Sequence, residues 1–273
     1  MTWFDQPSTD NSDQGFDVSD RGLLLADGVF TTALVHGGAM VFRAEHVARL
    51  IRDAGALGIY IEEPRVQRAI DDNLVPSGTA ALRLTVTRGV TSRGLAGSGT
   101  VAPTLLASCQ QIEVNQDPKP LSLAIASTRR NETSVTSQHK TLSYVDNIIA
   151  LTEAKRTGFD DAVFLNGMAH VTCSTTANIF CLFGEQLLTP PLKDGVLDGV
   201  TRKFVLDQAT DLGFDTRTES LSVTDIQSAD QVFLTNSLRG IVPVSKIGEA
   251  VFRTSVPRVL TEAWRQAVGI EDA

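Results

Sequence analysis

The sequence has few cysteines and no long hydrophobic run, and each shortage excludes a class of protein. Its three cysteines, Cys109, Cys173 and Cys181, form no CxxC pair and no zinc-ligand spacing. A sparse, odd cysteine count is typical of the reducing cytoplasm, where we expect this protein. No apolar run approaches the ~18 residues of a transmembrane helix, and the acidic, polar N-terminus does not resemble a signal or transit peptide. We therefore expect no metal site and no membrane partner.

Positive charge is also in short supply. Lysine and arginine total 24 against 32 aspartates and glutamates, which gives a formal net charge of −8. Nucleic acids and anionic membranes bind to basic patches, so we expect neither as a partner. A phosphate-bearing ligand would have to be bound by a few local groups. The 42% hydrophobic content allows a normal core, and 273 residues fit one large domain or two modest ones.

Hydrophobic periodicity predicts strands and helices that interleave without a regular βαβ alternation, which favours an α+β fold. Strands are predicted at 29–35, 80–87, 103–108, 121–127 and 177–183, and helices at 45–57, 63–74 and from residue 201. Asn166-Gly167 predicts a hairpin with a two-residue type I′ turn. The proline-containing stretch QDPKP predicts a linker at 116–120, between an N-terminal domain (1–115) and a C-terminal domain (121–273).

Lys140 is the first candidate for chemistry, in the stretch TSQHKTLSYVDNIIALTEAKRTG. It stands between His139 and Thr141, just before a run with an amphipathic helical pattern. A lysine becomes a nucleophile near neutral pH where burial or neighbouring cations disfavour its ammonium form, and it then serves in Schiff-base formation and proton transfer. Taken alone, Lys140 also fits an exposed loop lysine.

Two further stretches could bind an anion. In LDGVTRKFVLDQA a predicted helix begins at Thr201, and free amides at a helix N-terminus together with a hydroxyl make an anion site. Gly199 would let the backbone approach a phosphate, although it also fits an ordinary N-cap turn. Arg49, among the apolar positions of EHVARLIRDA, either extends to solvent along the helix or points a permanent cation at a phosphate.

Polar groups follow two other predicted strands. Arg88 and Arg93 flank a glycine-containing loop in TRGVTSRGL, where forked guanidinium groups would suit capture of a carboxylate. An exposed turn is the ordinary alternative for that loop. In TNSLRGIVPV, Asn236 and Ser237 end a strand. None of these signals is specific when taken singly.

In their order along the chain, these stretches resemble the class IV, fold-type IV family of enzymes that use pyridoxal 5′-phosphate (PLP). The matching stretches run from about Val18 to Val244 and read DRGLLLADGVFTT, FRAEHVARL, TRGVTSRG, HKTLSYVDNIIA, ANIF, LLTPPL, LDGVTR and TNSLRGIVPV. The family includes D-amino acid aminotransferases, branched-chain aminotransferases and 4-amino-4-deoxychorismate lyases. The resemblance implies a two-domain α+β enzyme that forms a homodimer, binds PLP between its domains and acts on a small amino compound.

The resemblance also implies roles for individual residues. Lys140 matches the lysine that carries the cofactor covalently, which we place on the C-terminal domain. The other cofactor contacts, to the phosphate and the ring, would be Arg49, Cys173, Thr175, Thr176, Leu197, Gly199, Val200, Thr201, Asn236 and Ser237. The substrate contacts would be Phe30, Arg88 and Arg93.

Cys173 departs from the family pattern. Members commonly carry a glutamate at this place in the strand, where its carboxylate pairs with the protonated pyridine nitrogen of the cofactor. A thiol is a weak hydrogen-bond partner and stays neutral when buried, so the cofactor ring would be a poorer electron sink. The alternatives are that another carboxylate reaches the nitrogen, or that the chain is a catalytically impaired PLP-binding relative.

Within the family, ADGVFTTALV, TRG…SRG and TTANIF look most like 4-amino-4-deoxychorismate lyases, which form 4-aminobenzoate and pyruvate in folate synthesis. The stretch HKTLSYVDNIIA also suits aminotransferases. D-amino acid aminotransferases tend to carry arginine and then histidine in the carboxylate loop, whereas Gly94 and Leu95 follow Arg93 here. The second interpretation is an aminotransferase acting on D- or branched-chain amino acids or on (R)-amines.

Overall fold

The computed structural model describes residues 2–5, 16–96, 102–115 and 117–270. The chain divides into two compact units, the first comprising Met1–Glu113 and His139–Ser143, and the second Val114–Gln138 and Tyr144–Ala273. Each unit contains both helices and strands, which confirms the α+β class. Among the described residues, no helix combines the length and the apolar character that crossing a membrane requires.

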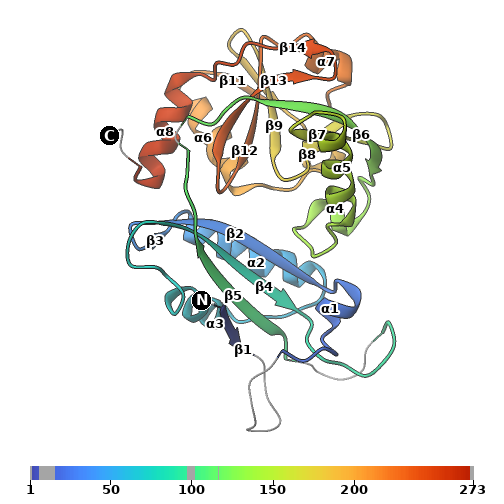
Figure 1. Ribbon diagram of the computed structural model, residues 1–273, viewed down its shortest axis with the longest axis vertical. Helices are drawn as coiled ribbons and strands as arrows, with labels where there is room; N and C mark the ends of the chain where they lie inside the picture. The colour runs from blue at the N-terminus through green and yellow to red at the C-terminus, as the bar shows by residue number, and fades with distance from the viewer. Residues whose placement is uncertain (1, 6–15, 97–101, 116, 271–273) are drawn as a thin grey trace. The chain divides into compact units, whose positions relative to one another are not determined.

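The first unit is an antiparallel sheet with helices packed against it (Figure 1). Its strand order is β1-β5-β4-β2-β3, and α2 packs against β2 while α3 packs against β5. Alternate residues of β2, including Val29, Ala33 and Val35, share a core with Leu50 of α2 because residues two apart on a strand face the same side. The elements are β1 (Thr2–Asp5), α1 (Arg21–Leu25), β2 (Gly28–His36), β3 (Ala39–Met40), α2 (Arg43–Ala56), α3 (Glu63–Asp71), β4 (Thr79–Thr87) and β5 (Thr104–Gln111).

The second unit contains a larger mixed sheet whose pairings close on themselves. Its strands run β11-β10-β9-β12-β13-β6-β7-β8, and β8 also pairs with β9. The helix α5 packs on β6 and β7, and α6 packs beside α8 (Figure 1). The elements are β6 (Leu121–Arg130), α4 (Val135–Gln138), α5 (Val145–Arg156), β7 (Asp161–Asn166), β8 (Val171–Ser174), β9 (Asn178–Phe183), β10 (Gln186–Thr189), η1 (Leu192–Asp194), α6 (Val200–Asp211), β11 (Asp215–Thr218), α7 (Val223–Gln227), β12 (Gln231–Asn236), β13 (Gly240–Ile247), β14 (Ala250–Val251) and α8 (Arg258–Val268).

The unit that contains Lys140 differs from the one predicted. We expected this lysine on the C-terminal domain, whereas 139–143 belongs to the first unit. The reason is backbone pairing: Thr141 forms a bridge with Val29, and the Phe30 N–H donates to the carbonyl of Lys140 at 2.9 Å. The limits 1–115 and 121–273 otherwise stay a prediction, and Gln116 of the expected linker lies outside the described residues.

The hairpin at Asn166-Gly167 forms between β7 and β8, but the predicted type I′ turn is wrong. The Asn166 N–H donates to His170 O, and the Ala169 N–H donates to Asn166 O, which makes a three-residue loop. A type I′ turn needs positive φ at both central residues. Here the positive φ, 64°, falls on Ala169 instead.

Candidate active site

Backbone bonds on two sides hold the segment around Lys140. Its carbonyl accepts from Phe30 N–H on β2, and the Leu142 N–H donates to Gly28 O at 3.0 Å. On the other side, the Lys140 N–H donates to Oδ2 of Asp53 on α2 at 3.1 Å. The half-buried Lys140 is therefore not the exposed loop lysine of the alternative interpretation.

The ammonium of Lys140 lies over the ring of Phe30, with Nζ 4.3 Å from the ring centroid. The guanidinium carbon of Arg83, on β4, lies 3.7 Å from the same centroid. Phe30 is only 6% exposed, so both cations contact an aromatic ring that is largely shielded from water. This contact links Phe30 to the predicted catalytic lysine, while its role in binding substrate stays a prediction.

Arg49 is buried on the face of α2 that packs against β2, so it does not extend to solvent. Its Nη2 donates to Thr31 Oγ1 at 2.9 Å, and Thr31 Oγ1 lies 2.7 Å from His46 Nδ1. Burial lowers the pKa of His46 well below its usual value, and the charges of Arg49 and Lys140 lower it further. The imidazole is therefore neutral, and positive charge in this cluster stays on Arg49 and Lys140.

Arg88 does not have the free guanidinium that carboxylate capture would require. Its Nε and Nη2 bind the carboxylate of Asp27 at 2.7 and 3.1 Å, and its Nη atoms also donate to Leu57 O and Gly58 O. Burial raises the pKa of Asp27, but hydrogen bonds from Arg88 and Arg21 outweigh it and lower the pKa overall. Arg88 therefore forms an ion pair at the end of β4, and its predicted role in binding substrate stays a prediction.

Arg93 lies exposed on the loop that follows β4. Arg21 holds the backbone of this loop, since its Nη1 and Nη2 donate to the carbonyls of Gly94 and Leu95 at 2.7 and 2.9 Å. A loop held through its backbone leaves the side chain of Arg93 directed to solvent. Its proposed contact with a substrate carboxylate stays a prediction.

In the second unit, the N-terminus of α6 has the features of a phosphate site. Gly199 is the N-cap and has no side chain, so no cap side chain occupies the first amides of the helix. A Cβ at Gly199 would lie 2.0 Å from Asn178 Oδ1, which explains the glycine. Thr201 is 2% exposed, and its hydroxyl has no hydrogen-bond partner among the described residues. A buried hydroxyl and open amides at one helix end fit a phosphate dianion.

The other predicted cofactor contacts of this unit lie near strand ends. Thr175 is buried, and its hydroxyl donates to Asp161 Oδ1 at 2.5 Å. Thr176 is exposed and accepts from Arg239 Nη2 at 3.2 Å. Asn236 Oδ1 accepts from two amides of the turn that contains the half-buried Ser237. Val200 is the first residue of α6, and the Leu197 carbonyl accepts from Asn178 Nδ2 at 2.9 Å.

Cys173 lies on β8, 6% exposed, within an alanine-rich apolar cluster. The other buried members of this cluster are Ala126, Ala150, Ala154, Ala162 and Phe164. The thiol accepts only a long bond, 3.7 Å, from the hydroxyl of Thr172. Cys173 therefore packs as a small hydrophobic residue, and its contact with a cofactor stays a prediction.

Sequence reasoning missed four residues that the structure places among the candidate groups. Thr31, His46 and Asp53 join Arg49 and the lysine segment. Thr235, just before Asn236, has a buried hydroxyl without a partner among the described residues. A signal for two of the four was present, because His46 and Asp53 recur at helical spacing with the predicted Arg49 within an apolar face.

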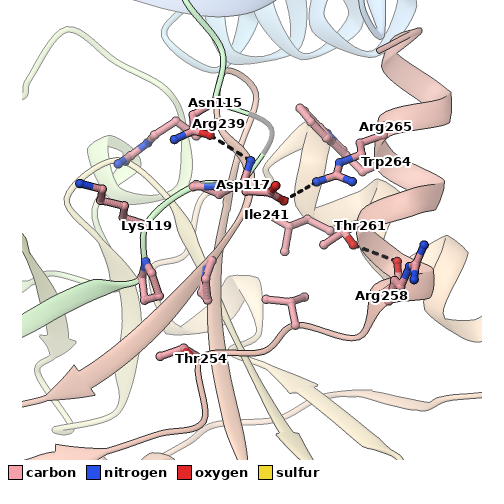
Figure 2. Close-up of a pocket in the computed structure, with 14 residues that line it drawn as sticks. Asn115, Asp117, Lys119, Arg239, Ile241, Thr254, Arg258, Thr261, Trp264 and Arg265 are labelled. Atoms are coloured by element: carbon pink, nitrogen blue, oxygen red, sulfur yellow. Dashed lines mark hydrogen bonds and ion pairs between the residues drawn. The ribbon is translucent and has the colours of Figure 1, made fainter. Parts of the chain in front are cut away.

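A separate hollow lies in the second unit, bordered by residues 115 and 117–120, β13 and α8 (Figure 2). It has a volume of about 580 Å³ and contains the cationic residues Lys119, Arg239, Arg258 and Arg265. Figure 2 shows Asp117 paired with Arg265, at 2.7 Å. None of the predicted site residues lines this hollow, although Arg239 of its lining donates to Thr176.

Over most of its length, the chain is similar to known lyases and to a known aminotransferase. Aminodeoxychorismate lyase of Bacillus subtilis is 28% identical over 84% of this chain and 80% of its own. The solved structure of 4-amino-4-deoxychorismate lyase from Pseudomonas aeruginosa is 26% identical, covers 97% of this chain and 98% of its own, and has a TM-score of 0.84. D-alanine aminotransferase of Bacillus licheniformis is 24% identical over 93% of this chain and 90% of its own.

The model of the family described as amino-transferase class IV matches residues 28–247, most of the chain. This range contains Arg49, Lys140 and Thr201, the residues around which the candidate site is built. The resemblance inferred from the sequence is thereby confirmed, together with the α+β fold class. The chain belongs to the class IV aminotransferase family.

Proposed function

We propose that this protein is a PLP-dependent lyase that cleaves 4-amino-4-deoxychorismate to 4-aminobenzoate and pyruvate, a step of folate synthesis. The observation that supports the choice of reaction is the likeness to aminodeoxychorismate lyases across most of the chain. The cofactor is supported by the chain itself. Buried Arg49 supplies a cation, Thr201 a free buried hydroxyl, and the start of α6 open amides, which are the groups a phosphate dianion requires.

Each residue then has a defined task. When bound, PLP withdraws electrons from the substrate carbon that bears the amino group. Arg49, Thr201 and the α6 amides would hold its phosphate, and Lys140 Nζ would hold the cofactor covalently between turnovers. With substrate bound, the free Nζ of Lys140 would take the proton from the carbon that bears the amino group. The electron pair left behind would form the last ring double bond as the C–O bond to the enolpyruvyl group breaks, and the released enolate would take up a proton on carbon to give pyruvate.

The same groups would serve an aminotransferase, which is the second candidate because D-alanine aminotransferase also matches most of the chain. The two reactions differ after the proton has been removed. An aminotransferase passes the amino group to a keto acid, whereas the lyase needs no second substrate because expulsion of the enolpyruvyl group makes the ring aromatic. Arg93, rather than Arg88, is the candidate for a substrate carboxylate, because Arg88 is bound to Asp27.

The deciding experiment supplies PLP-loaded protein with 4-amino-4-deoxychorismate and no keto acid, and assays 4-aminobenzoate and pyruvate. Equimolar amounts of both products are expected, and the Lys140→Ala variant should release neither. Reduction with borohydride should fix a pyridoxyl group on Lys140. Absence of product together with amino transfer from D-alanine or an (R)-amine would establish the second candidate.

Cys173 motivates a third candidate, a PLP-binding relative with impaired catalysis. The β8 position that would carry a carboxylate holds a thiol packed among alanines. Normal lyase turnover would exclude this candidate. An absorbance spectrum typical of lysine-bound PLP, without turnover of any substrate in the panel, would support it.

We further infer that the enzyme is a homodimer and acts in the cytoplasm. Helix α5 exposes a row of large apolar side chains, Val145, Ile148 and Ile149, which lie three and four residues apart and so share one face. A second copy of the chain is the partner we propose for this face. Light scattering should give a molar mass twice that of one chain for the wild type, and a molar mass of one chain for Ile148→Glu. The cytoplasmic location is supported by the sparse cysteine content.

A further inference from the structure

Asp53 contacts the lysine segment from α2. Its side chain is 1% exposed, and its two oxygens bind adjacent residues: Oδ1 lies 2.9 Å from His139 Nδ1, and Oδ2 accepts from the Lys140 N–H at 3.1 Å. Arg52, the third polar partner, approaches Oδ1 at 3.4 Å from a half-exposed position. Each oxygen of the buried Asp53 carboxylate thus contacts one of two consecutive residues, His139 and Lys140, which lie 86 and 87 positions further along the sequence.

The peptide of Lys140 is consequently fixed at both of its polar groups. Its carbonyl is held by Phe30 N–H of β2, and its N–H by Asp53 of α2. A residue bound at donor and acceptor cannot rotate its backbone without breaking a bond, so the direction of its Cα–Cβ bond is set as well. From this fixed origin the side chain extends to place Nζ over the Phe30 ring.

We propose that Asp53 is a positioning residue for Lys140, in that its carboxylate fixes the lysine backbone and thereby determines where Nζ can react. The proposal rests on the catalytic role given to Lys140 under the proposed function. Asp53 does not touch the cofactor in this account. Its effect is confined to the rate at which Nζ reaches the carbonyl carbon of PLP and the proton of the substrate.

The chain offers a matched control in Asp20. It is a fully buried carboxylate of the same unit, and it also accepts from a backbone amide, Gly22 N–H, and from the hydroxyls of Thr87 and Thr104. These partners do not include any residue of 139–143. Asp20→Ala therefore reproduces the loss of a buried carboxylate without altering the bond to Lys140.

The first measurement is amide hydrogen exchange at Lys140 in the full-length protein, with and without PLP. Asp53→Ala should raise the exchange rate at this amide tenfold or more, because the bond to Oδ2 is lost, whereas Asp20→Ala should leave it unchanged. Asp53→Asn retains one acceptor oxygen and should lie between the two. This measurement does not depend on the reaction that the enzyme catalyses.

The second measurement separates covalent attachment from binding. The loss of a charge-assisted hydrogen bond corresponds to about 10- to 150-fold, and we expect the rate of borohydride-trapped attachment of PLP to Lys140 to fall by this factor in Asp53→Ala. Affinity for pyridoxamine 5′-phosphate, which has an amine in place of the aldehyde and forms no bond with lysine, should change less than about threefold. If Asp53→Ala does not fold, Asp53→Asn serves for both measurements.

The outcomes are distinct. Attachment at the wild-type rate, or equal losses of attachment and of pyridoxamine phosphate affinity, overturns the positioning role. The same result from Asp20→Ala also overturns it. If wild-type protein never attaches PLP to Lys140, the proposed function fails, and the exchange rate still reports whether Asp53 fixes the backbone of Lys140.

Discussion

At the scale of single residues, two buried threonines of the second unit differ in one respect. The Thr189 hydroxyl donates to Ile179 O at 2.8 Å, whereas the Thr201 hydroxyl has no partner among the described residues. A buried hydroxyl without a partner destabilises the fold, unless a ligand completes it. The two threonines therefore provide a matched pair of substitutions.

Thr201→Val should leave the cofactor-free protein as stable as the wild type or slightly more stable, because no internal hydrogen bond is lost. Its affinity for PLP should fall by about 10- to 150-fold, the equivalent of one hydrogen bond to a charged group. Thr189→Val should show the reverse, a loss of about 1 kcal/mol in unfolding free energy with unchanged PLP affinity. Urea denaturation and cofactor titration check both. Equal PLP affinity in Thr201→Val would remove Thr201 from the phosphate site.

The sequence allowed prediction of some individual residues and not of others, for a physical reason. Arg49 stood out as a cation inside an apolar helical pattern, and the structure buries it. The ion pair of Arg88 was not predicted because its partner Asp27 lies 61 positions away, and pairing at that distance depends on the register of β4 with β2. Asp53 was missed for the same reason, since its partners are His139 and Lys140.

At the scale of elements, the β7–β8 loop tests how turn chemistry was interpreted. Asn-Gly indicated a two-residue turn at 166–167, but the left-handed residue is Ala169. A side chain at positive φ is strained, and glycine is not. The hairpin was predictable from its flanking strands, whereas its loop length depended on the bonds of the Asn166 side chain, whose Oδ1 accepts from the amides of Met168 and His170.

Ala169→Gly should therefore stabilise the protein by about 0.5–1 kcal/mol, because the strain at φ 64° is relieved. Gly167→Ala should be nearly neutral, since Gly167 is outside the left-handed region and a Cβ there would meet only the flexible carboxylate of Glu132, at 3.2 Å. Thermal unfolding of both variants checks the expectation. A type I′ turn would give the opposite order, with Gly167→Ala the costly change.

At the scale of the whole molecule, buried His46 makes stability depend on pH. Its pKa in the folded protein is lowered well below 6.5 by burial, then by Arg49 and Lys140. In the unfolded chain it takes up a proton near pH 6.5. The neutral form therefore contributes stability that is fully present above this pH and is lost as the pH falls, because the unfolded state binds the extra proton.

Between pH 7 and pH 5 this contribution should fall by up to about 2 kcal/mol, the limit for one proton bound only by the unfolded chain. The measurement is unfolding free energy by urea at several pH values, for the wild type and for His46→Gln. Groups other than His46 titrate in both proteins, so the difference between the two curves isolates the imidazole. Parallel curves would show that folding does not lower the pKa of His46.

The α+β class and most elements follow from periodicity, but the division into units does not. Composition and the prolines of QDPKP indicated one crossing between two domains, whereas residues 139–143 return to the first unit. That return rests on pairing of Thr141 with Val29, which joins residues more than a hundred positions apart. Local patterns carry no information about such a pairing.

This return of the chain limits how the gene could be recombined with that of a relative. A single crossover anywhere between residues 54 and 138 would take Asp53 and Phe30 from one parent and His139 and Lys140 from the other. Where the junction falls between residues 109 and 123, such a hybrid would take each hydrophobic core from a single parent while mixing the origins of the groups that hold the lysine. We expect hybrids to inherit function only where the Asp53 and His139 positions are compatible in both parents. A crossover after residue 143 keeps these groups together and is the safer junction for building chimeras.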